Sequence, residues 1–303
     1  MELVHAEPAY KDLMIKLSTF SPTFISACLS FVVLTLPTSP YAADKAPLND
    51  ACWDMSFSED FDDLSLWDET TGTGRWKTSY IWGSDIVINN ELQYYIDPDV
   101  HGLSPFAVKD GILQIIADHT PDSLLEKVDY RPYISGVLTT ENDFSQQHGR
   151  FEMFAKVPEG RGLWSAFWLL PSFNQWPEGV AVLPEIDVME HLGHQTRTYH
   201  TTLHTNQTGK LSSHPYDHTE RQDLTKDFHL YSVVWTPERV DWYLDKQWKA
   251  SHPTPSDFTR PVHFLLNLAV GGNWPGEPDR RTRFPARYSV DYVRAWTAQP
   301  NCN

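Results

Sequence analysis

Short strand-like runs separated by turn residues recur along the chain from Trp53 onward. The run 150–157 places Phe151, Met153 and Ala155 on one side of an extended backbone and charged residues on or near the other, which is the alternation of a half-buried strand. The 22 Pro and 15 Gly residues punctuate the whole length, and we see no long helical period, internal repeat or low-complexity linker. Many short strands with turn signals predict an all-β fold, a β-sandwich.

Three carboxylates stand close together in the run Glu185-Ile-Asp-Val-Met-Glu190, among residues that favour strands. Because strand side chains alternate, Glu185 and Asp187 should point the same way. Strict alternation would send Glu190 to the opposite face, but a β-bulge adds one residue and returns it to the side of the other two. The spacing therefore predicts three carboxylates on one face of a bulged strand.

Two glutamates that face one cleft, with an aspartate between them, are the groups that a retaining glycosidase needs. One carboxylate attacks the anomeric carbon, and the other protonates the leaving oxygen and later activates water. Crowded like charges raise at least one pKa, which keeps one acid protonated near neutral pH. On spacing alone, a solvated acidic strand or a metal site remains an alternative.

The segment Pro184-Glu-Ile-Asp-Val-Met-Glu-His191 resembles the active-site strand of family 16 glycoside hydrolases, in its bulged, laminarinase-like form. Other segments resemble that family in the same order along the chain: Gly149–Met153, Gly162–Pro171, Phe228–Trp235, Val240–Asp245, Leu266–Gly276 and Val290–Trp296. The resemblance covers residues 53–297. It implies a concanavalin A-like jelly roll of two curved antiparallel sheets, whose concave face is an open substrate cleft.

The same resemblance implies roles for the carboxylates. Glu185 is the expected nucleophile and Glu190 the expected acid/base, and Asp187 between them is an electrostatic helper that can hydrogen-bond the nucleophile and tune its proton affinity. His204 would lie on the neighbouring strand and face the carboxylates if 199–205 pairs with the catalytic strand. The alternative for His204 is a surface or structural role.

Several other residues are predicted to contact sugar. Trp164 and Trp168 share one face of a strand where the family places aromatic platforms; we expect Trp168 in the cleft, and Trp164 in the cleft or the core. Trp274 lies in a glycine-proline turn where a large ring is hard to bury, which favours a sugar contact. The remaining predicted contacts are Asn90, Glu91 and Gln93, in a loop that resembles the family's cleft edge, and Arg150, whose alternative is a solvated strand charge.

The resemblance also implies a structural calcium ion opposite the cleft, held by Glu59, the Gly111 carbonyl and Asp291, whose oxygen atoms suit Ca²⁺. No cofactor is expected for catalysis. His200, His214 and His218 lack the tight ligand spacing of a transition-metal site.

The N-terminal segment 1–43 is interpreted as an extension followed by a secretory signal peptide. A charged start is followed by the apolar run 24–36 and by small residues up to Ala43; a retained membrane anchor is the alternative. Residues 44–303 then form a single catalytic domain in a secreted or periplasmic protein. We predict a disulfide between Cys52 and Cys302, because the two lie at opposite ends of that domain and an exported protein meets oxidising conditions.

The formal net charge of −16 argues against nucleic acid and anionic membrane surfaces as partners. It also disfavours sulfated or uronate-rich chains, although acidity can simply keep a secreted protein soluble. An aromatic content of 13% suits carbohydrate, because a flat ring covers the apolar face of a sugar while its polar edge stays wet. The expected partner is therefore a neutral polysaccharide, and the expected assembly is a monomer.

Together these features predict an endo-acting, retaining β-glucanase that cuts 1,3-linked or mixed 1,3-1,4-linked glucan by double displacement. The alternatives are a galactan hydrolase of the agarase or carrageenase kind, a transglycosylase, and a carbohydrate-binding jelly roll without catalysis. The last would have no need of three carboxylates on one face. A long insert before the catalytic strand, 172–183, is expected to shape one rim of the cleft.

Overall fold

The computed structural model of the chain describes residues 48, 50–84, 86–172 and 184–299. The segment predicted to be a signal peptide and most of the insert at 172–183 lie outside these residues. Helix is scarce in the described part, which holds the short α2 (Pro98–His101) and a 3-10 turn, η1 (Asp122–Val128). Neither has the length and apolar character that a helix needs to cross a membrane.

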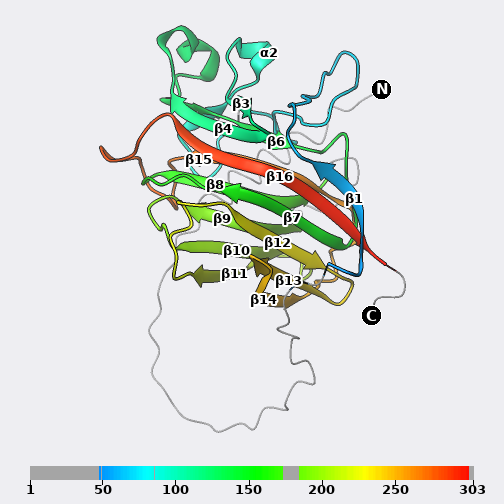
Figure 1. The fold of residues 1–303 in the computed structure, drawn as a ribbon. Helices are drawn as coiled ribbons and strands as arrows, with labels where there is room; N and C mark the ends of the chain where they lie inside the picture. The colour runs from blue at the N-terminus through cyan, green and yellow to red at the C-terminus, as the bar shows by residue number, and fades with distance from the viewer. Residues whose placement is uncertain (1–47, 49, 85, 173–183, 300–303) are drawn as a thin grey trace.

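The strands form two sheets, one packed against the other (Figure 1). The six-stranded sheet has the order β11 (Ser212–Thr219), β10 (Thr198–Thr205), β9 (Glu185–Leu192), β8 (Leu163–Pro171), β15 (Val262–Val270) and β6 (Val137–Thr139). The ten-stranded sheet runs β14 (Gln247–Pro253), β13 (Arg239–Leu244), β12 (His229–Trp235), β7 (Gly149–Lys156), β16 (Ala286–Ala298), β4 (Ile112–His119), β5 (Tyr133–Ser135) and β2 (Gln93–Tyr95), with β1 (Trp53–Glu59) on β16 and β3 (Phe106–Lys109) on β4. This architecture confirms the predicted all-β sandwich.

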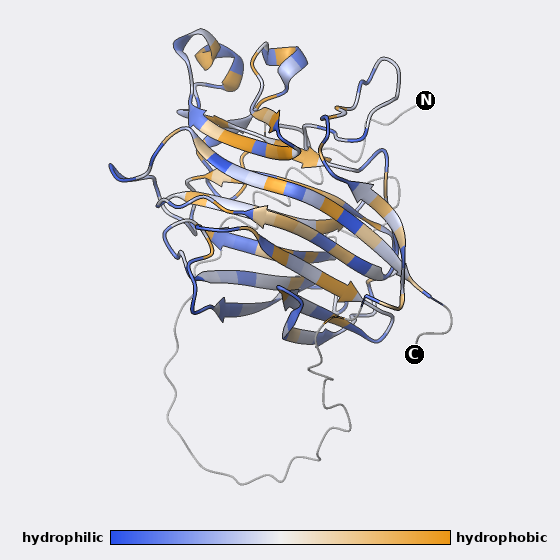
Figure 2. Cartoon of the chain, viewed as in Figure 1, coloured by the Kyte–Doolittle hydropathy of each residue, from blue (hydrophilic) through white to orange (hydrophobic). Residues whose placement is uncertain are grey.

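One large apolar core fills the space between the sheets. Phe151, Met153 and Ala155 of β7 point into it, as the alternation of that strand predicted. Ile186 and Val188 of β9 meet them from the other sheet. Apolar and polar residues alternate along many of the strands (Figure 2). Because each large apolar side chain buried in this way contributes about 1.5–3 kcal/mol, the core fixes which face of each strand points outward.

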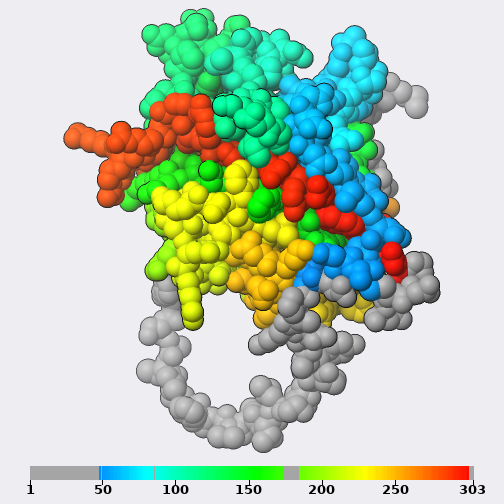
Figure 3. Space-filling view, in the orientation of Figure 1, coloured from blue at the N-terminus to red at the C-terminus, as the bar shows by residue number. Residues whose placement is uncertain are grey.

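The first and last strands lie side by side, and β1 (blue) runs along the C-terminal part of β16 (red) in Figure 3. Their pairing begins at Trp53 and Ala298. The Gln299 amide also donates a hydrogen bond to the Cys52 carbonyl. Cys52 is disulfide-bonded, while Cys302, the partner that the sequence predicts, lies outside the described residues.

A β-bulge in β9 decides where the carboxylates point. Met189 pairs with Phe167 of β8, and the next pair is Asp187 with Trp168, so the register shifts by one residue. The same shift appears against β10. Both Val188 and Met189 are consequently buried in the core. The indole N–H of Trp242 donates to the Asp187 carbonyl at 3.0 Å across the core and stabilises the backbone beside the bulge.

Candidate active site

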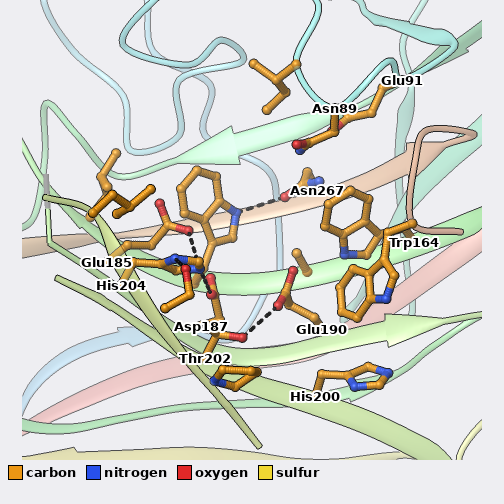
Figure 4. A pocket seen from close by; sticks show the side chains of 18 of the residues that line it. Asn89, Glu91, Trp164, Glu185, Asp187, Glu190, His200, Thr202, His204 and Asn267 are labelled. Atoms are coloured by element: carbon orange, nitrogen blue, oxygen red, sulfur yellow. Dashed lines mark hydrogen bonds and ion pairs between the residues drawn. The ribbon is translucent and has the colours of Figure 1, made fainter. Parts of the chain in front are cut away.

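A cleft of about 900 Å³ lies on the face of the six-stranded sheet that points away from the core (Figure 4). Side chains of β8, β9, β10 and β11 form its floor, and the loop 80–91 contributes one wall. The bulge brings Glu185, Asp187 and Glu190 together in this cleft. Each side chain points there because its neighbours along β9 are apolar and occupy the core.

The three carboxylates differ in their access to water. The Glu185 side chain is 29% exposed, whereas that of Asp187 is 5% exposed. Glu190 is also buried. Asp187 lies between the two glutamates and its carboxyl group is in hydrogen-bond contact with that of Glu185. The Thr202 hydroxyl donates a long hydrogen bond, 3.4 Å, to Glu190 Oε2. Water therefore reaches Glu185 more readily than the other two.

His204 faces the carboxylates from β10, where it pairs with Glu185 across the strands. Its Nε2 lies 3.2 Å from Asp187 Oδ2 and 3.8 Å from Glu185 Oε1. Its Nδ1 is 2.8 Å from the Ser213 hydroxyl of β11. Because both nitrogens have neighbours, the ring is held with one edge toward the acids.

Burial is the first cause that raises the pKa of each carboxyl group in the cleft. The pKa of Glu190 rises well above its usual range, because the charge of Asp187 adds to burial. Burial and Asp187 also raise the pKa of Glu185, while His204 lowers it. The group that keeps a proton most readily is thus Glu190. The pKa of Glu185 rises to about 8 and that of Asp187 to about 7, and Glu185 is the one of the three that water reaches most readily.

Glu185, Asp187 and His204 offer ligand atoms within 4.8 Å of one another, and no other trio of His, Cys, Asp or Glu in the described residues does so. A metal ion is therefore geometrically compatible with this point. The arrangement of the glutamates suits acid–base and nucleophilic chemistry without a metal, because Glu185 is partly exposed while Glu190 is buried and kept protonated.

The three predicted tryptophans all line the cleft. Trp168 stands beside Asp187 on the neighbouring strand, and its indole N–H donates to Asn267 Oδ1 at 2.9 Å. Trp164 meets Trp274 edge to face, with ring centroids 5.3 Å apart. The sequence left Trp164 either in the cleft or in the core, and the structure places it in the cleft.

The loop that resembles the cleft edge contributes differently from the prediction. Glu91 lines the cleft, together with Asn89, but Asn90 and Gln93 do not. Asn90 instead donates to Asn273 Oδ1 at 2.8 Å, and Gln93 donates to Glu91 Oε2 at 2.7 Å. Asn90 thus stabilises the loop and Gln93 holds the Glu91 carboxyl group, and neither side chain lines the cleft.

Arg150 is not a substrate contact, and that prediction is wrong. It lies on β7 of the other sheet, buried on the outer face. Its guanidinium donates to Glu152 Oε2 and to Asp50 Oδ1, at 2.5 and 2.6 Å, and stacks 4.5 Å from the Trp296 ring centroid. Alternation gave the correct face of the strand but did not indicate to which sheet the strand belonged.

The predicted calcium ligands fit the ion only in part. The Glu59 carboxylate already accepts hydrogen bonds from the Phe61 amide and the Trp76 indole, at 3.1 and 3.0 Å, and pairs with Arg75. It therefore offers no free carboxylate. Asp291 is half-buried; burial raises its pKa, the charge of Arg294 lowers it, and the charge of Asp60 raises it. Arg294 pairs with Asp60 at 2.6 Å and already relieves part of that repulsion, so Asp291 is the predicted carboxylate that remains for a cation.

Other cleft residues escaped the sequence analysis. Tyr80 and Trp82 stack with centroids 4.6 Å apart and line the cleft beside Trp168. His200 and Thr202 also line it, and the period of two on the strand that carries His204 was a signal that could have found them. Nothing in the sequence indicated Tyr80 or Trp82, because loop residues follow no period.

The comparisons with known proteins agree with this geometry. The sequence pattern of "Glycosyl hydrolases family 16" matches residues 104–294. Endo-1,3-1,4-beta-glycanase EglC of Rhizobium meliloti is 39% identical over 250 residues, which are 80% of this chain and 51% of EglC. The chain thus spans about half the length of that relative.

Two further similarities extend over most of the partner protein. A beta-glucanase of Rhodothermus marinus is 34% identical over 275 residues, 84% of this chain and 87% of that protein. The laminarinase catalytic domain of Thermotoga maritima MSB8 superposes with a TM-score of 0.67 at 32% identity, covering 82% of this chain and 99% of that structure.

Proposed function

This chain belongs to family 16 of the glycosyl hydrolases, and we propose that it is an endo-acting, retaining β-glucanase for 1,3-linked or mixed 1,3-1,4-linked glucan. The observation that carries the proposal is the pair Glu185 and Glu190 on one face of a bulged strand, within an open cleft lined by tryptophans. The two-sheet fold is the jelly roll that the family resemblance predicted. The similar proteins are an endo-1,3-1,4-beta-glycanase, a beta-glucanase and a laminarinase, and these activities support the substrate class.

In the first displacement, a Glu185 carboxylate oxygen attacks the anomeric carbon. The bond from that carbon to the leaving oxygen breaks, and Glu190 gives its proton to this oxygen. The product is a glycosyl ester on Glu185, and Glu190 is left as a carboxylate. Desolvation makes the charged form of Glu190 costly, so Glu190 keeps its proton until the leaving oxygen takes it.

In the second displacement, water attacks the same carbon and the ester bond to Glu185 breaks. Glu190 takes a proton from that water, so two inversions restore the β configuration. The change of role follows from electrostatics. Esterified Glu185 carries no charge, so one of the like charges that raise the pKa of Glu190 is removed during the intermediate. His204 remains beside Glu185 and stabilises its charge when it is released.

The sugar-binding surface is built from flat rings and a few polar groups. Trp168, Tyr80 and Trp82 form one aromatic group in the cleft, and Trp164 with Trp274 forms another. Such rings bind the apolar faces of pyranoses. The acidic balance of the chain, −16, favours a neutral glucan over a sulfated galactan.

We further propose a secreted or periplasmic protein that carries a structural calcium ion and acts as a monomer. The signal-like segment 1–43 and the disulfide-bonded Cys52 support export. The half-buried Asp291 carboxylate, and Gly111 beside the Asp60 backbone carbonyl, support a calcium site on the outer side of the sandwich. Such an ion would stabilise the fold and take no part in the chemistry.

A product profile tests the proposed function. The protein is incubated with laminarin, barley mixed-linkage glucan, agarose and carrageenan, and the released anomeric centre is followed by NMR. Early oligosaccharides of β configuration from either glucan are the expected result, and the preferred glucan defines the linkage. Cleavage of the galactans alone would overturn the substrate class, and binding without cleavage would show a lectin-like protein.

A further inference from the structure

Beyond Glu190, the cleft contains an aromatic array whose position along the bound sugar chain the mechanism above does not define. Its members are Trp164, Trp274 and His200, with Asp217 behind the histidine, and all of them line the cleft. Figure 4 shows Trp164 and His200 on the Glu190 side, away from Glu185. The array therefore lies at one end of the catalytic pair.

The ring of His200 is fixed from both edges. It lies on β10, directly opposite Glu190 of β9 and Asp217 of β11. Its Nδ1 is 2.8 Å from Asp217 Oδ1, and its Nε2 is 3.2 Å from Gln195 Oε1. With both nitrogens engaged and the side chain only 8% exposed, the ring offers its face rather than a nitrogen to its neighbours.

That face meets Trp274, with ring centroids 4.7 Å apart at 60°. Trp274 also packs at 87° against Trp164. Although two rings hold it, 42% of Trp274 is exposed, which is unusual for so large an apolar side chain. Its turn is tied down by the bond from Asn90 to Asn273. The sandwich keeps an indole face open and fixed in orientation.

The chemistry of the first displacement indicates what that face would meet. Glu190 protonates the leaving oxygen, so the sugar that carries this oxygen lies on the Glu190 side of the anomeric carbon. We infer that His200 is a positioning residue that holds Trp274 as the platform for the leaving-group sugar. This inference rests on the proposed function. The same platform would receive an acceptor saccharide, whose hydroxyl oxygen attacks the glycosyl ester while Glu190 takes its proton and Glu185 is released.

Two glycosyl donor substrates distinguish this positioning role from a general structural role. A glucan oligosaccharide places sugars on both sides of the broken bond, whereas the β-glycosyl fluoride of the glycone disaccharide releases only fluoride and leaves the platform empty. Since an aromatic contact contributes about 0.5–1.5 kcal/mol, His200→Ala should lower kcat/KM on the oligosaccharide by about tenfold. On the fluoride, kcat/KM should stay within about twofold, because ring contacts at the far subsite are not used.

Transfer gives a second readout that a merely structural role would not change. With the fluoride as donor and a glucan disaccharide as acceptor, the ratio of transfer to hydrolysis should fall by about tenfold in His200→Ala. His252→Ala is the matched control, because it removes another histidine ring contact, with His214, outside the residues that line the cleft. Asp217→Ala tests the same array if His200→Ala does not fold, since the Asp217 side chain is 75% exposed.

The outcomes are distinct. Equal losses on both donors, or no change on either, would overturn the positioning role while leaving the proposed function intact. If the unaltered protein released no oligosaccharide from laminarin or mixed-linkage glucan, the proposed function would fail, and this inference with it. A selective loss on the oligosaccharide, together with reduced transfer, is the result that supports it.

Discussion

Each of the two sheets carries a cluster of buried carboxylates on its outward face, and the two clusters are balanced in opposite ways. On β7, Glu152 accepts hydrogen bonds from Arg150 Nε and Nη2 and from the Ser232 hydroxyl. On β9, Asp187 and the two glutamates face one another, with the His204 ring at their edge. Both clusters lie outside the shared core, on strands whose apolar side chains point into it.

The difference lies in compensation. Burial raises the pKa of Glu152, but the charge and hydrogen bonds of Arg150 lower it. In the cleft, burial acts together with like charges, so the pKa values of the glutamates are raised with little opposition. A buried charge that is fully paired has little net effect on the free energy of folding. An unpaired buried charge destabilises the fold, and its shifted pKa suits catalysis. The same residue type thus serves structure on one sheet and chemistry on the other.

The largest expected effect comes from Glu185→Gln. Loss of the nucleophile should lower kcat on glucan on the order of 10⁴-fold or more, while oligosaccharide binding persists. Because a costly buried charge is removed, the free energy of unfolding in urea should not decrease. Glu159→Gln is the control, since it removes an exposed glutamate that pairs with Lys226 on the surface. Hydrolysis that survived Glu185→Gln would show that the nucleophile is misassigned.

Arg150→Met should give the opposite profile. It leaves Glu152 buried without its cation, and the free energy of unfolding should fall by about 3–5 kcal/mol. In the fraction that stays folded, kcat/KM should remain within about twofold, because the two clusters share no residue. The double variant Arg150→Met with Glu152→Gln should recover most of the stability, as replacing both partners removes the unpaired charge. An activity loss in the folded single variant would contradict the separation of the clusters.

The contrast also explains what the sequence could predict. Recurring short strands with turn signals predicted a β-sandwich, and the family resemblance implied its two sheets. The E-x-D-x-x-E spacing predicted the bulge, since a bulge is a local property of one strand. Arg150 was misplaced because alternation assigns a face but not a sheet. Asn90 was preferred to Asn89 because loop backbones follow no period, and both residues adopt positive φ there. The period of two on its strand could have placed His200 in the cleft, but only the folded structure reveals its contacts with Asp217 and Trp274.

Glu91 is another buried carboxylate, and its titration should make the free energy of unfolding depend on pH. Burial, opposed by bonds from Gln93 and Asn89, raises its pKa to about 7 from 4.5. Between those values the folded protein keeps a proton that the unfolded chain has lost, so the free energy of unfolding should fall as pH rises. The fall amounts to about 3 kcal/mol across this window, and the loss persists above pH 7.

Urea unfolding of Glu91→Gln at pH 5 and pH 8 isolates this contribution, because glutamine does not titrate. The difference between the two pH values should be smaller in the variant than in the unaltered protein by about 3 kcal/mol. Any constant change from the altered hydrogen bonds cancels in that difference. Equal pH dependence in both proteins would show that Glu91 titrates normally.

The smallest effect should come from His204→Gln, which removes the side chain that lowers the raised pKa values of the two glutamates. His204 lowers the pKa of both Glu185 and Glu190, so its loss should raise both. The acidic limb of kcat/KM reports ionisation of the nucleophile, and the basic limb reports deprotonation of the acid. Both limbs should therefore move to higher pH, while the maximum falls far less than in Glu185→Gln. His252→Gln, outside the cleft lining, should leave the limbs in place. A profile that kept its limbs but lost height would assign His204 to orientation of Asp187 rather than to charge.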